Sequence, residues 1–341
     1  MRSPLGADIM GEFGLPYARL PLRGLVAILA MTFTAAANAA APAAPAAASS
    51  QTEFVLHEVG PGVYAAIDGP AHKAGSNAGF IIGDNGVVVV DSFFDPEATR
   101  QLVTAIRGLT AKPILYVVNT HYHVDHTGGD GVLKAAGATI IAQRNVRAWL
   151  HTENYHLLGG RVTPALKAQI DALPDPDIAV DRSLTLWLGA RRVELRYWPG
   201  HTGGDLVVSV PDAKVVFCGD LFWNRVSPNV IDGTVGRWIA TDASLAAAPD
   251  AVATTFVPGH GELGKVGDLA AFEDYLATLS TQVAAARASG LSGAALADAV
   301  EPQMKARFGD WGAFAYFVPK EIGFMAAELD GTKVVPKPEA P

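Results

Sequence analysis

The sequence predicts an α/β protein in which helices cover β-sheet. From Phe54 onward, each half of the chain begins with short β-rich runs and continues with alternating strands and helices, an order typical of layered α/β domains. Of the 341 residues, 50% are hydrophobic and 18% are charged. This composition belongs to a globular protein with a large core.

The N-terminus is predicted to be a secretory signal over residues 1–39. Two arginines, Arg19 and Arg23, precede the apolar run at 24–33, and the sequence ANA at 37–39 suits a cleavage site. The apolar run is about half of the ~20 residues that a membrane span needs. Residues 40–51 are predicted to be a flexible Ala/Pro-rich lead-in. We therefore expect a periplasmic or secreted protein without stable membrane association after cleavage.

Charge and cysteine content limit the partners. The formal net charge of −8 argues against nucleic acid and against an anionic membrane surface as partners. The one cysteine, Cys218, allows no internal disulfide. We interpret it as a small buried hydrophobe rather than a metal ligand.

In the first half, turn and capping residues define the elements. The tripeptide DNG at 84–86 predicts the turn of a hairpin over 77–92. Asp95 as N-cap, with Pro96 at the first helical position, predicts a helix through Leu109. The continuous apolar run that follows predicts a buried strand.

The second half repeats this order and then becomes helical. Pro211-Asp212 predicts a hairpin turn, and residues 237–248 predict a helix before the strand at 253–260. Residues 52–264 are expected to form the main domain. Residues 265–331 are expected to be helices that pack on it or complete it, and 332–341 a loose tail.

Metal-binding side chains follow four apolar runs. His121 follows LYVVNT, His201 follows LRYWPG, Asp220 follows VVFCG and His260 follows TTFVPG. In open α/β sheets, ligands bind outside the carboxyl ends of the strands. We therefore expect these four side chains to converge in space.

The densest cluster is THYHVDHTGG, which holds His121, His123, Asp125 and His126. Its three imidazoles would repel one another if protonated, but they become compatible when a divalent cation takes their lone pairs. Mixed imidazole and carboxylate ligands favour zinc or iron. In an extended segment the first three side chains would project to one side. Gly128-Gly129 would then turn the chain sharply, so that His126 points elsewhere.

The motifs HxHxDH at 121–126, PGHTGGD at 199–205, FCGDLF at 217–222 and VPGHG at 257–261 resemble the metallo-β-lactamase fold superfamily in order and spacing. The resemblance covers Phe54 to Gly261 and implies a four-layered αββα sandwich, here with a helical C-terminal extension. It is specific for the fold and the metal site. It leaves the substrate open, because one fold hosts many reactions.

The resemblance also implies which residues bind two metal ions, expected to be two Zn²⁺ with iron as the alternative. The first ion would be bound by His121, His123 and His201, the second by Asp125, His126 and His260, and Asp220 would bridge both.

The pentapeptide HTGGD, found at 126–130 and 201–205, would then present one ligand to each metal. Each Gly-Gly pair would let the backbone turn away. Asp130 and Asp205 are expected to be structural.

Such a site predicts an exported dinuclear zinc hydrolase. Two metals about 3.5–4 Å apart can hold a bridging hydroxide, because metal binding lowers the pKa of water towards roughly 7. This hydroxide would attack the carbonyl of a small substrate, which is a β-lactam-like amide, an ester or a thioester. Asp125 is the expected catalytic residue, orienting the nucleophile and carrying a proton.

Three alternatives stay open. The first is a glyoxalase II-like thioesterase. β-Lactamases of this superfamily generally carry Cys or Ser at the position of Asp220, whereas an Asp at this position resembles glyoxalase II. An iron-dependent oxidoreductase of sulfur species is the second. A non-catalytic metal-bearing accessory protein of a periplasmic oxidation system is the third.

The predicted substrate pocket includes three residues outside the ligand set. Phe222 and Trp223 follow the bridging position and could form an apolar wall. His72 lies in the loop GPAHKAGSNAG, at a place where this family often carries a mobile flap.

Overall fold

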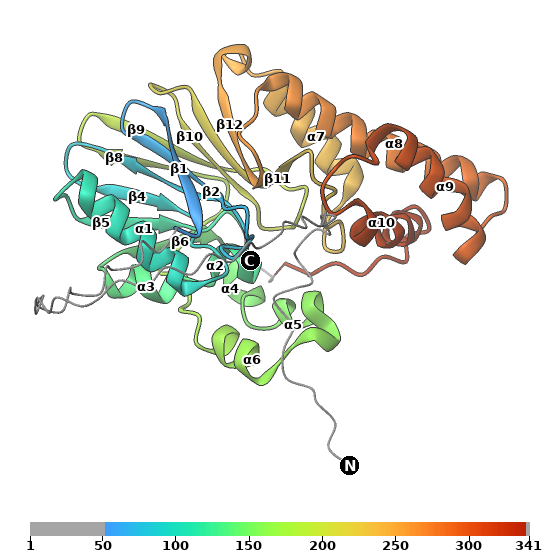
Figure 1. The fold of residues 1–341 in the computed structure, drawn as a ribbon, viewed down its shortest axis with the longest axis horizontal. Coiled ribbons are helices and arrows are strands. Elements are labelled where there is room, and N and C mark those ends of the chain that lie inside the picture. The colour runs from blue at the N-terminus through green and yellow to red at the C-terminus, as the bar shows by residue number, and fades with distance from the viewer. Residues whose placement is uncertain (1–51, 339–341) are drawn as a thin grey trace, which may run out of the picture.

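The computed structural model describes residues 52–338 (Figure 1). The predicted signal peptide and residues 40–51 of the lead-in lie outside this range, as do residues 339–341. No helix within the described range is both long enough and apolar enough to cross a membrane.

The first sheet has seven strands in chain order. They are β1 (Phe54–Gly60), β2 (Val63–Asp68), β3 (Ala78–Ile82), β4 (Val87–Val90), β5 (Ile114–Val118), β6 (Thr139–Gln143) and β7 (Ile178–Val180). Pairing is antiparallel from β1 to β4 and parallel from β4 to β7. The predicted hairpin is β3–β4.

The second sheet has five strands in the order β12-β11-β10-β9-β8. They are β8 (Ser183–Leu188), β9 (Arg191–Tyr197), β10 (Leu206–Val210), β11 (Val215–Asn224) and β12 (Thr255–Gly261). Only β11 and β12 are parallel within this sheet.

The two sheets pack face to face with helices outside, which confirms the αββα sandwich (Figure 1). Strand β4 shows why, because all four of its valines are buried. Val88 and Val90 join the apolar layer between the sheets, while Val87 and Val89 pack with helix α1 (Pro96–Leu109). Alternate side chains of a strand point to opposite faces, so a continuous valine run suits a strand covered on both sides.

The outer helices begin where the sequence predicts. Asp95 caps α1, accepting a hydrogen bond from Glu97 N at 2.8 Å. Helix α3 (Asp130–Ala135) packs beside α1, and α7 (Val235–Ala246) and α8 (Val266–Ala288) cover the second sheet. Shorter helical segments connect the rest: α2 (Val124–Thr127), α4 (Val146–Trp149), α5 (Glu153–Leu158), η2 (Gly159–Arg161), α6 (Pro164–Asp171) and η3 (Ala251–Ala253).

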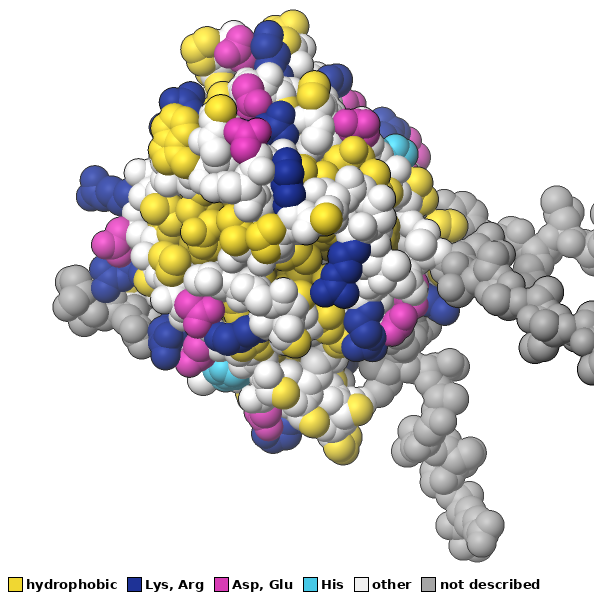
Figure 2. Space-filling model, turned by 90° about the vertical axis from the view of Figure 1, so that its left-hand side faces the viewer, with side chains coloured by type: hydrophobic (Ala, Val, Ile, Leu, Met, Phe, Trp, Pro, Cys, Tyr) yellow, Lys and Arg dark blue, Asp and Glu magenta, His cyan; other side chains and the backbone are white. Residues whose placement is uncertain are grey.

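The C-terminal helices share one core with the second sheet. Helix α8 packs on β11, and α9 (Gly293–Phe308) and α10 (Phe314–Leu329) pack on α8. The extension projects beyond the sandwich in Figure 1. At the opposite end of the sandwich, Figure 2 shows apolar groups between interspersed positive and negative side chains.

The tail differs from the loose segment that was predicted. The Nζ of Lys333 donates to Val230 O and Gly233 O, both at 2.7 Å. Further along, Lys337 O accepts from the indole of Trp149 at 3.0 Å. Tail lysines are commonly solvated, but here one ammonium replaces its water with backbone carbonyls.

Glu321 of α10 should make folding stability depend on pH. Its carboxyl group is buried, accepts from Tyr275 Oη at 2.6 Å, and has a pKa raised by burial from 4.5 to about 8. The folded state therefore binds the extra proton between these values, so this group's contribution to stability is full below pH 4.5 and is lost as pH rises towards 8. We expect Glu321→Gln to flatten that decline.

Urea midpoints of the two proteins at pH 5 and pH 8 provide the test, with Asp298→Asn on the exposed surface of α9 as the matched control. An identical pH slope in Glu321→Gln and the parent protein would contradict the assignment.

Candidate metal centre

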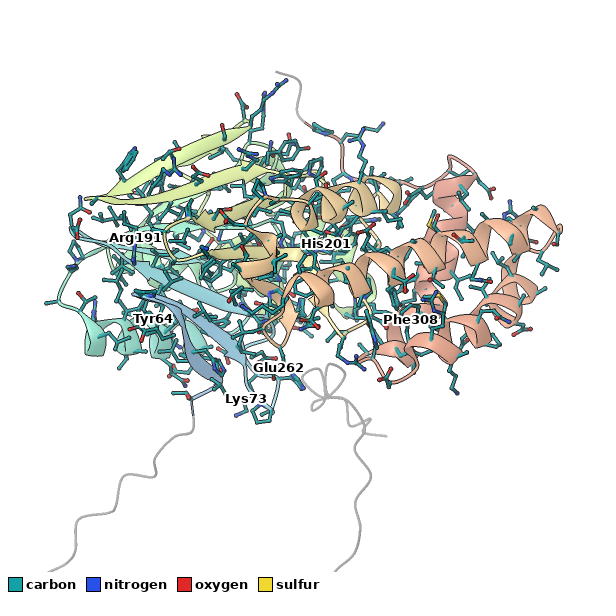
Figure 3. All side chains as sticks on the ribbon, turned by 90° about the horizontal axis from the view of Figure 1, so that it is seen from above. Tyr64, Lys73, Arg191, His201, Glu262 and Phe308 are labelled. Atoms are coloured by element: carbon teal, nitrogen blue, oxygen red, sulfur yellow. The ribbon has the colours of Figure 1, made fainter. Side chains whose placement is uncertain are left out.

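The predicted ligands come from both sheets and meet between them. His121 follows β5, His123 caps α2, Asp125 and His126 lie in α2, His201 lies between β9 and β10, Asp220 lies within β11 and His260 within β12. Figure 3 shows His201 towards the middle of the molecule, whereas Phe308 lies out in the helical extension.

Two details of the sequence-based interpretation were wrong. The segment 121–126 is not extended, because α2 begins at Val124. The strands β11 and β12 continue past Asp220 and His260 rather than ending before them. Instead of ending, β11 is irregular around Gly219, where its register against β12 shifts and φ is +53°.

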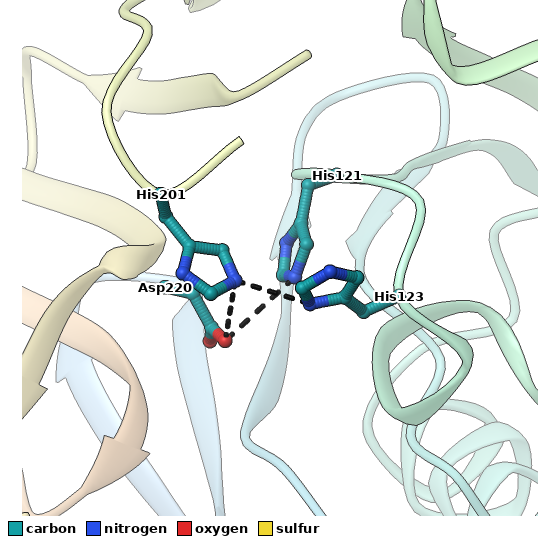
Figure 4. A group of neighbouring side chains, drawn as sticks. All are labelled: His121, His123, His201 and Asp220. Atoms are coloured by element: carbon teal, nitrogen blue, oxygen red, sulfur yellow. Dashed lines mark hydrogen bonds and ion pairs between the residues drawn. The ribbon is translucent and has the colours of Figure 1, made fainter. Parts of the chain in front are cut away.

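The first ligand group is His121, His123, His201 and Asp220, whose ligand atoms lie within 4.8 Å of one another (Figure 4). His201 Nε2 lies 3.2 Å from Asp220 Oδ2 and 3.1 Å from His123 Nδ1. His121 Nε2 lies 3.7 Å from the same carboxylate oxygen. All four side chains are buried.

The second ligand group is Asp125, His126 and His260. The Nε2 atoms of His126 and His260 lie 3.0 Å and 3.4 Å from Asp220 Oδ1. His260 Nε2 also lies 3.3 Å from Asp125 Oδ2. The two oxygens of Asp220 therefore face different groups, which is the arrangement of a bridging carboxylate.

The donor atoms fit metal ions. Within residues 52–338, the Nε2 atoms of His121, His126 and His260 and the Oδ1 atom of Asp220 are buried without a hydrogen-bond partner. Buried polar atoms are normally hydrogen-bonded, so four such atoms in one cluster indicate an ion. A set of imidazole nitrogens and carboxylate oxygens suits zinc or iron.

The two groups differ in protonation. Burial lowers the pKa of His121 well below 6.5 and that of His201 to about 3, so both rings are neutral with lone pairs free. At His260 burial also lowers the pKa, but the carboxylates of Asp220 and Asp125 outweigh it and raise the pKa to about 9. Metal binding in the second group must therefore displace protons.

Hydrogen bonds on the far side of the rings fix their orientation. Asp91 Oδ2 lies 2.9 Å from His126 Nδ1, and the Asp91 carboxylate also accepts from Thr120 N at 2.7 Å and Thr120 Oγ1 at 2.8 Å. Thr120 Oγ1 in turn lies 3.0 Å from His121 Nδ1. These contacts aim the Nε2 atoms of both rings into the centre.

His123 is oriented from the other side by Asp232, whose Oδ2 lies 3.3 Å from His123 Nε2 and also accepts from Tyr122 Oη. This leaves His123 Nδ1 facing His201. Sequence reasoning missed both Asp91 and Asp232. Asp91 follows the valine run of β4, the same signature that marked the other ligands, whereas Asp232 lies in a loop without a pattern.

The repeated glycines serve close packing rather than sharp turning. Gly128 and Gly129 have φ values of −59° and −97°. An added Cβ would come within 2.3 Å of Phe94 O at Gly128 and within 2.9 Å of the Trp149 ring at Gly203. As predicted, Asp205 is structural, accepting from Gly200 N and Thr202 N at 2.9 Å.

Asp130 also has a structural role, because its Oδ1 accepts from Ser92 Oγ at 2.7 Å and Asn119 Nδ2 at 3.0 Å. Cys218 is buried in the apolar core and belongs to neither ligand group.

The predicted pocket residues lie in three different environments. Trp223 stacks on His260 with ring centroids 4.0 Å apart, and is 4% exposed. Phe222 is fully buried and packs on Phe272, which makes it a core residue rather than a pocket wall. His72 is partly exposed and pairs with Asp68 at 2.9 Å.

Comparison with known proteins places the chain in a family. The family model described as "Metallo-beta-lactamase superfamily" matches residues 73–260. The chain belongs to this superfamily and is a metal-dependent hydrolase.

Two curated relatives show the range of the match. A metallo-beta-lactamase type 2 of Bacillus cereus is 27% identical over 199 residues, which are 56% of this chain and 69% of that protein. A hydroxyacylglutathione hydrolase of Brucella anthropi is 27% identical over 175 residues, 51% of this chain and 57% of that protein.

Among solved structures, the sec-alkylsulfatase Pisa1 of Pseudomonas sp. has a TM-score of 0.63 at 20% identity. The match covers 80% of this chain and 50% of that one. A metallo-beta-lactamase from Pontibacter korlensis has a TM-score of 0.52 at 20% identity, covering 65% of this chain and 98% of the other. These likenesses show the fold.

Removing the carboxylate of Asp91 should weaken metal binding. We expect Asp91→Asn to lower zinc affinity about 10–100-fold, a usual cost of losing a partner behind a ligand. Competition with a chromogenic chelator measures the affinity. Asp181→Asn is the matched control, because that side chain is 74% exposed. Equal affinities for both variants would show that Asp91 does not position His126.

Proposed function

We propose that the protein is an exported dinuclear zinc hydrolase of small carbonyl substrates, in which attack of hydroxide on the carbonyl carbon breaks the C–N, C–O or C–S bond of an amide, ester or thioester. One observation carries the dinuclear part: the two oxygens of Asp220 face separate ligand groups, at 3.2 Å from His201 and 3.0 Å from His126. When bound, two zinc ions would lower the pKa of water towards neutrality and polarise the substrate carbonyl.

Asp125 is the residue proposed to move the proton. Its side chain is 29% exposed, whereas that of Asp220 is 2% exposed. Its backbone carbonyl accepts from Ser76 Oγ at 2.6 Å, so the loop before β3 holds it in place. A carboxylate that is both held and accessible can take a proton from the attacking water and return it to the leaving group.

Carbonyl substrates divide into two branches. The two relatives, at the same 27% identity, bear the names metallo-beta-lactamase type 2 and hydroxyacylglutathione hydrolase. Asp220 favours the ester and thioester branch. Export would favour β-lactams, because a periplasmic protein meets those compounds there.

Turnover assays separate the branches. We expect the zinc-loaded protein to hydrolyse either a chromogenic cephalosporin or members of a thioester and ester panel. His123→Ala should abolish this turnover, because it removes a ligand of the first group. His156→Ala on the exposed surface of α5 is the control. Full activity of His123→Ala without metal would overturn the mechanism.

Metal analysis completes the test. Iron rather than zinc in the natively loaded protein would favour the oxidoreductase. If protein that holds two metal ions hydrolyses neither the cephalosporin nor the esters and thioesters, the non-catalytic accessory protein becomes the favoured alternative.

Asp125→Asn should lower the rate of the reaction even in protein that still holds both metal ions. The amide cannot act as a base, so we expect kcat to fall about 10²–10⁴-fold, while the first ligand group keeps its zinc. Steady-state rates and zinc content per protein are the two measurements. Unchanged kcat in a variant with full zinc content would exclude Asp125 from proton transfer.

Export is tested on the protein itself. Peptide sequencing of the mature N-terminus should begin near Ala40, in material from the periplasm or the medium. A cytoplasmic protein that retains residues 24–33 would contradict export.

A further inference from the structure

Lys333 is a buried lysine outside the ligand set, with a side chain that is 5% exposed. Its ammonium donates to Val230 O and Gly233 O and lies 3.3 Å from Glu328 Oε2. A buried charge must find such partners in place of water. Both carbonyls belong to one short segment, Val230–Thr234, which we call the arc.

The arc contacts two metal ligands of the first group. Asp232 lies between the two carbonyls that Lys333 binds, and its carboxylate orients His123. Thr234 N donates to Gly200 O at 2.9 Å, next to His201. At Gly233 an added Cβ would lie 3.3 Å from His201 O, so the arc packs directly on that ligand's backbone.

The residues around Lys333 hold the same region at two more points. The carboxylate of Glu328 accepts from Val235 N at 3.0 Å and Gly236 N at 3.2 Å, where the arc enters α7. Lys337 O accepts from Trp149, whose ring packs edge-to-face on Tyr122 at 5.7 Å. Tyr122 in turn donates to Asp232. We call residues 332–337 the strap.

We propose that the strap positions the first ligand group, with Lys333 as the positioning residue that acts through Asp232 and the arc. The inference rests on the proposed function for the presence of a metal in that group. It goes further by assigning the C-terminal tail a role in the affinity of one of the two sites. His126 and His260 of the second group are held by other parts of the chain, Asp91 behind His126 and Trp223 against His260.

Lys333→Met keeps most of the length of the side chain and removes the ammonium. Two buried carbonyls then lose their donor, and Asp232 is held less firmly behind His123. We expect the zinc affinity of the first group to fall about 10–100-fold. The affinity of the second group should stay within about twofold of the parent value, because Lys333 acts through Asp232 on His123, which is not a ligand of the second group.

The experiment titrates zinc into full-length protein in two backgrounds. His260→Ala weakens the second group and leaves the first for study, while His123→Ala does the reverse. Each background is measured with and without Lys333→Met. Lys337→Met is the matched control, since it makes the same change of charge on an exposed side chain of the same strap. Thermal melting of the metal-free proteins reports on folding.

The expected result is weaker zinc binding by Lys333→Met in the His260→Ala background only, with Lys337→Met unchanged in both. Equal losses in both backgrounds, or none, would overturn the strap's role. If Lys333→Met does not fold, Lys333→Gln retains an amide donor and should give a smaller loss with the same selectivity. A parent protein that binds no zinc would refute the proposed function, and the strap's role with it. A parent that binds two equivalents, with no effect of Lys333 variants, would refute the strap only.

Discussion

The structure depends on one buried carboxylate, that of Asp220, between two sets of imidazoles. Burial would ordinarily raise the pKa of such a group, but the nearby His126 and His260 hold it well below its usual value. A buried anion is tolerated only where cations or donors surround it. The architecture supplies these from several elements at once. Gly259 lets the backbone of β12 lie directly against the Asp220 carboxylate, since an added Cβ there would lie 1.9 Å from Asp220 Oδ1.

The sandwich makes this convergence possible because its two sheets bring separate halves of the chain together. The first sheet contributes the segment after β5, and the second contributes the β9–β10 loop together with β11 and β12. Thr120 links the halves: its side chain binds Asp91, and Leu206 N donates to its carbonyl at 2.7 Å. Gly219 packs against the same threonine, where an added Cβ would lie 2.5 Å from Thr120 Oγ1. The same contacts of Thr120 therefore fix the metal ligands and hold the two sheets together.

Much of this could be predicted from the sequence, because the ligands are set in local patterns. His121 and His201 follow strands, and Asp95-Pro96 starts α1 where the capping rule places it. What could not be predicted depends on distant contacts. Gly128 resembles a turn residue until Phe94 O is found against it. Asp232 looks like an ordinary loop residue until folding brings it to His123, 109 positions away. In the sequence Lys333 resembles a solvated tail lysine, and its carbonyl partners, Val230 O and Gly233 O, are brought to it only by folding.

The C-terminal helices are therefore more than an addition to the sandwich. Helix α8 covers the second sheet and shares its core with α9 and α10. The end of α10 supplies Glu328 to the start of α7, and the strap continues from there to Trp149. Trp149 packs on the second HTGGD through Gly203 and on HxHxDH through Tyr122. The two motifs that carry the first metal ligands thus meet at one indole, and that indole is fixed by the chain's last described residues.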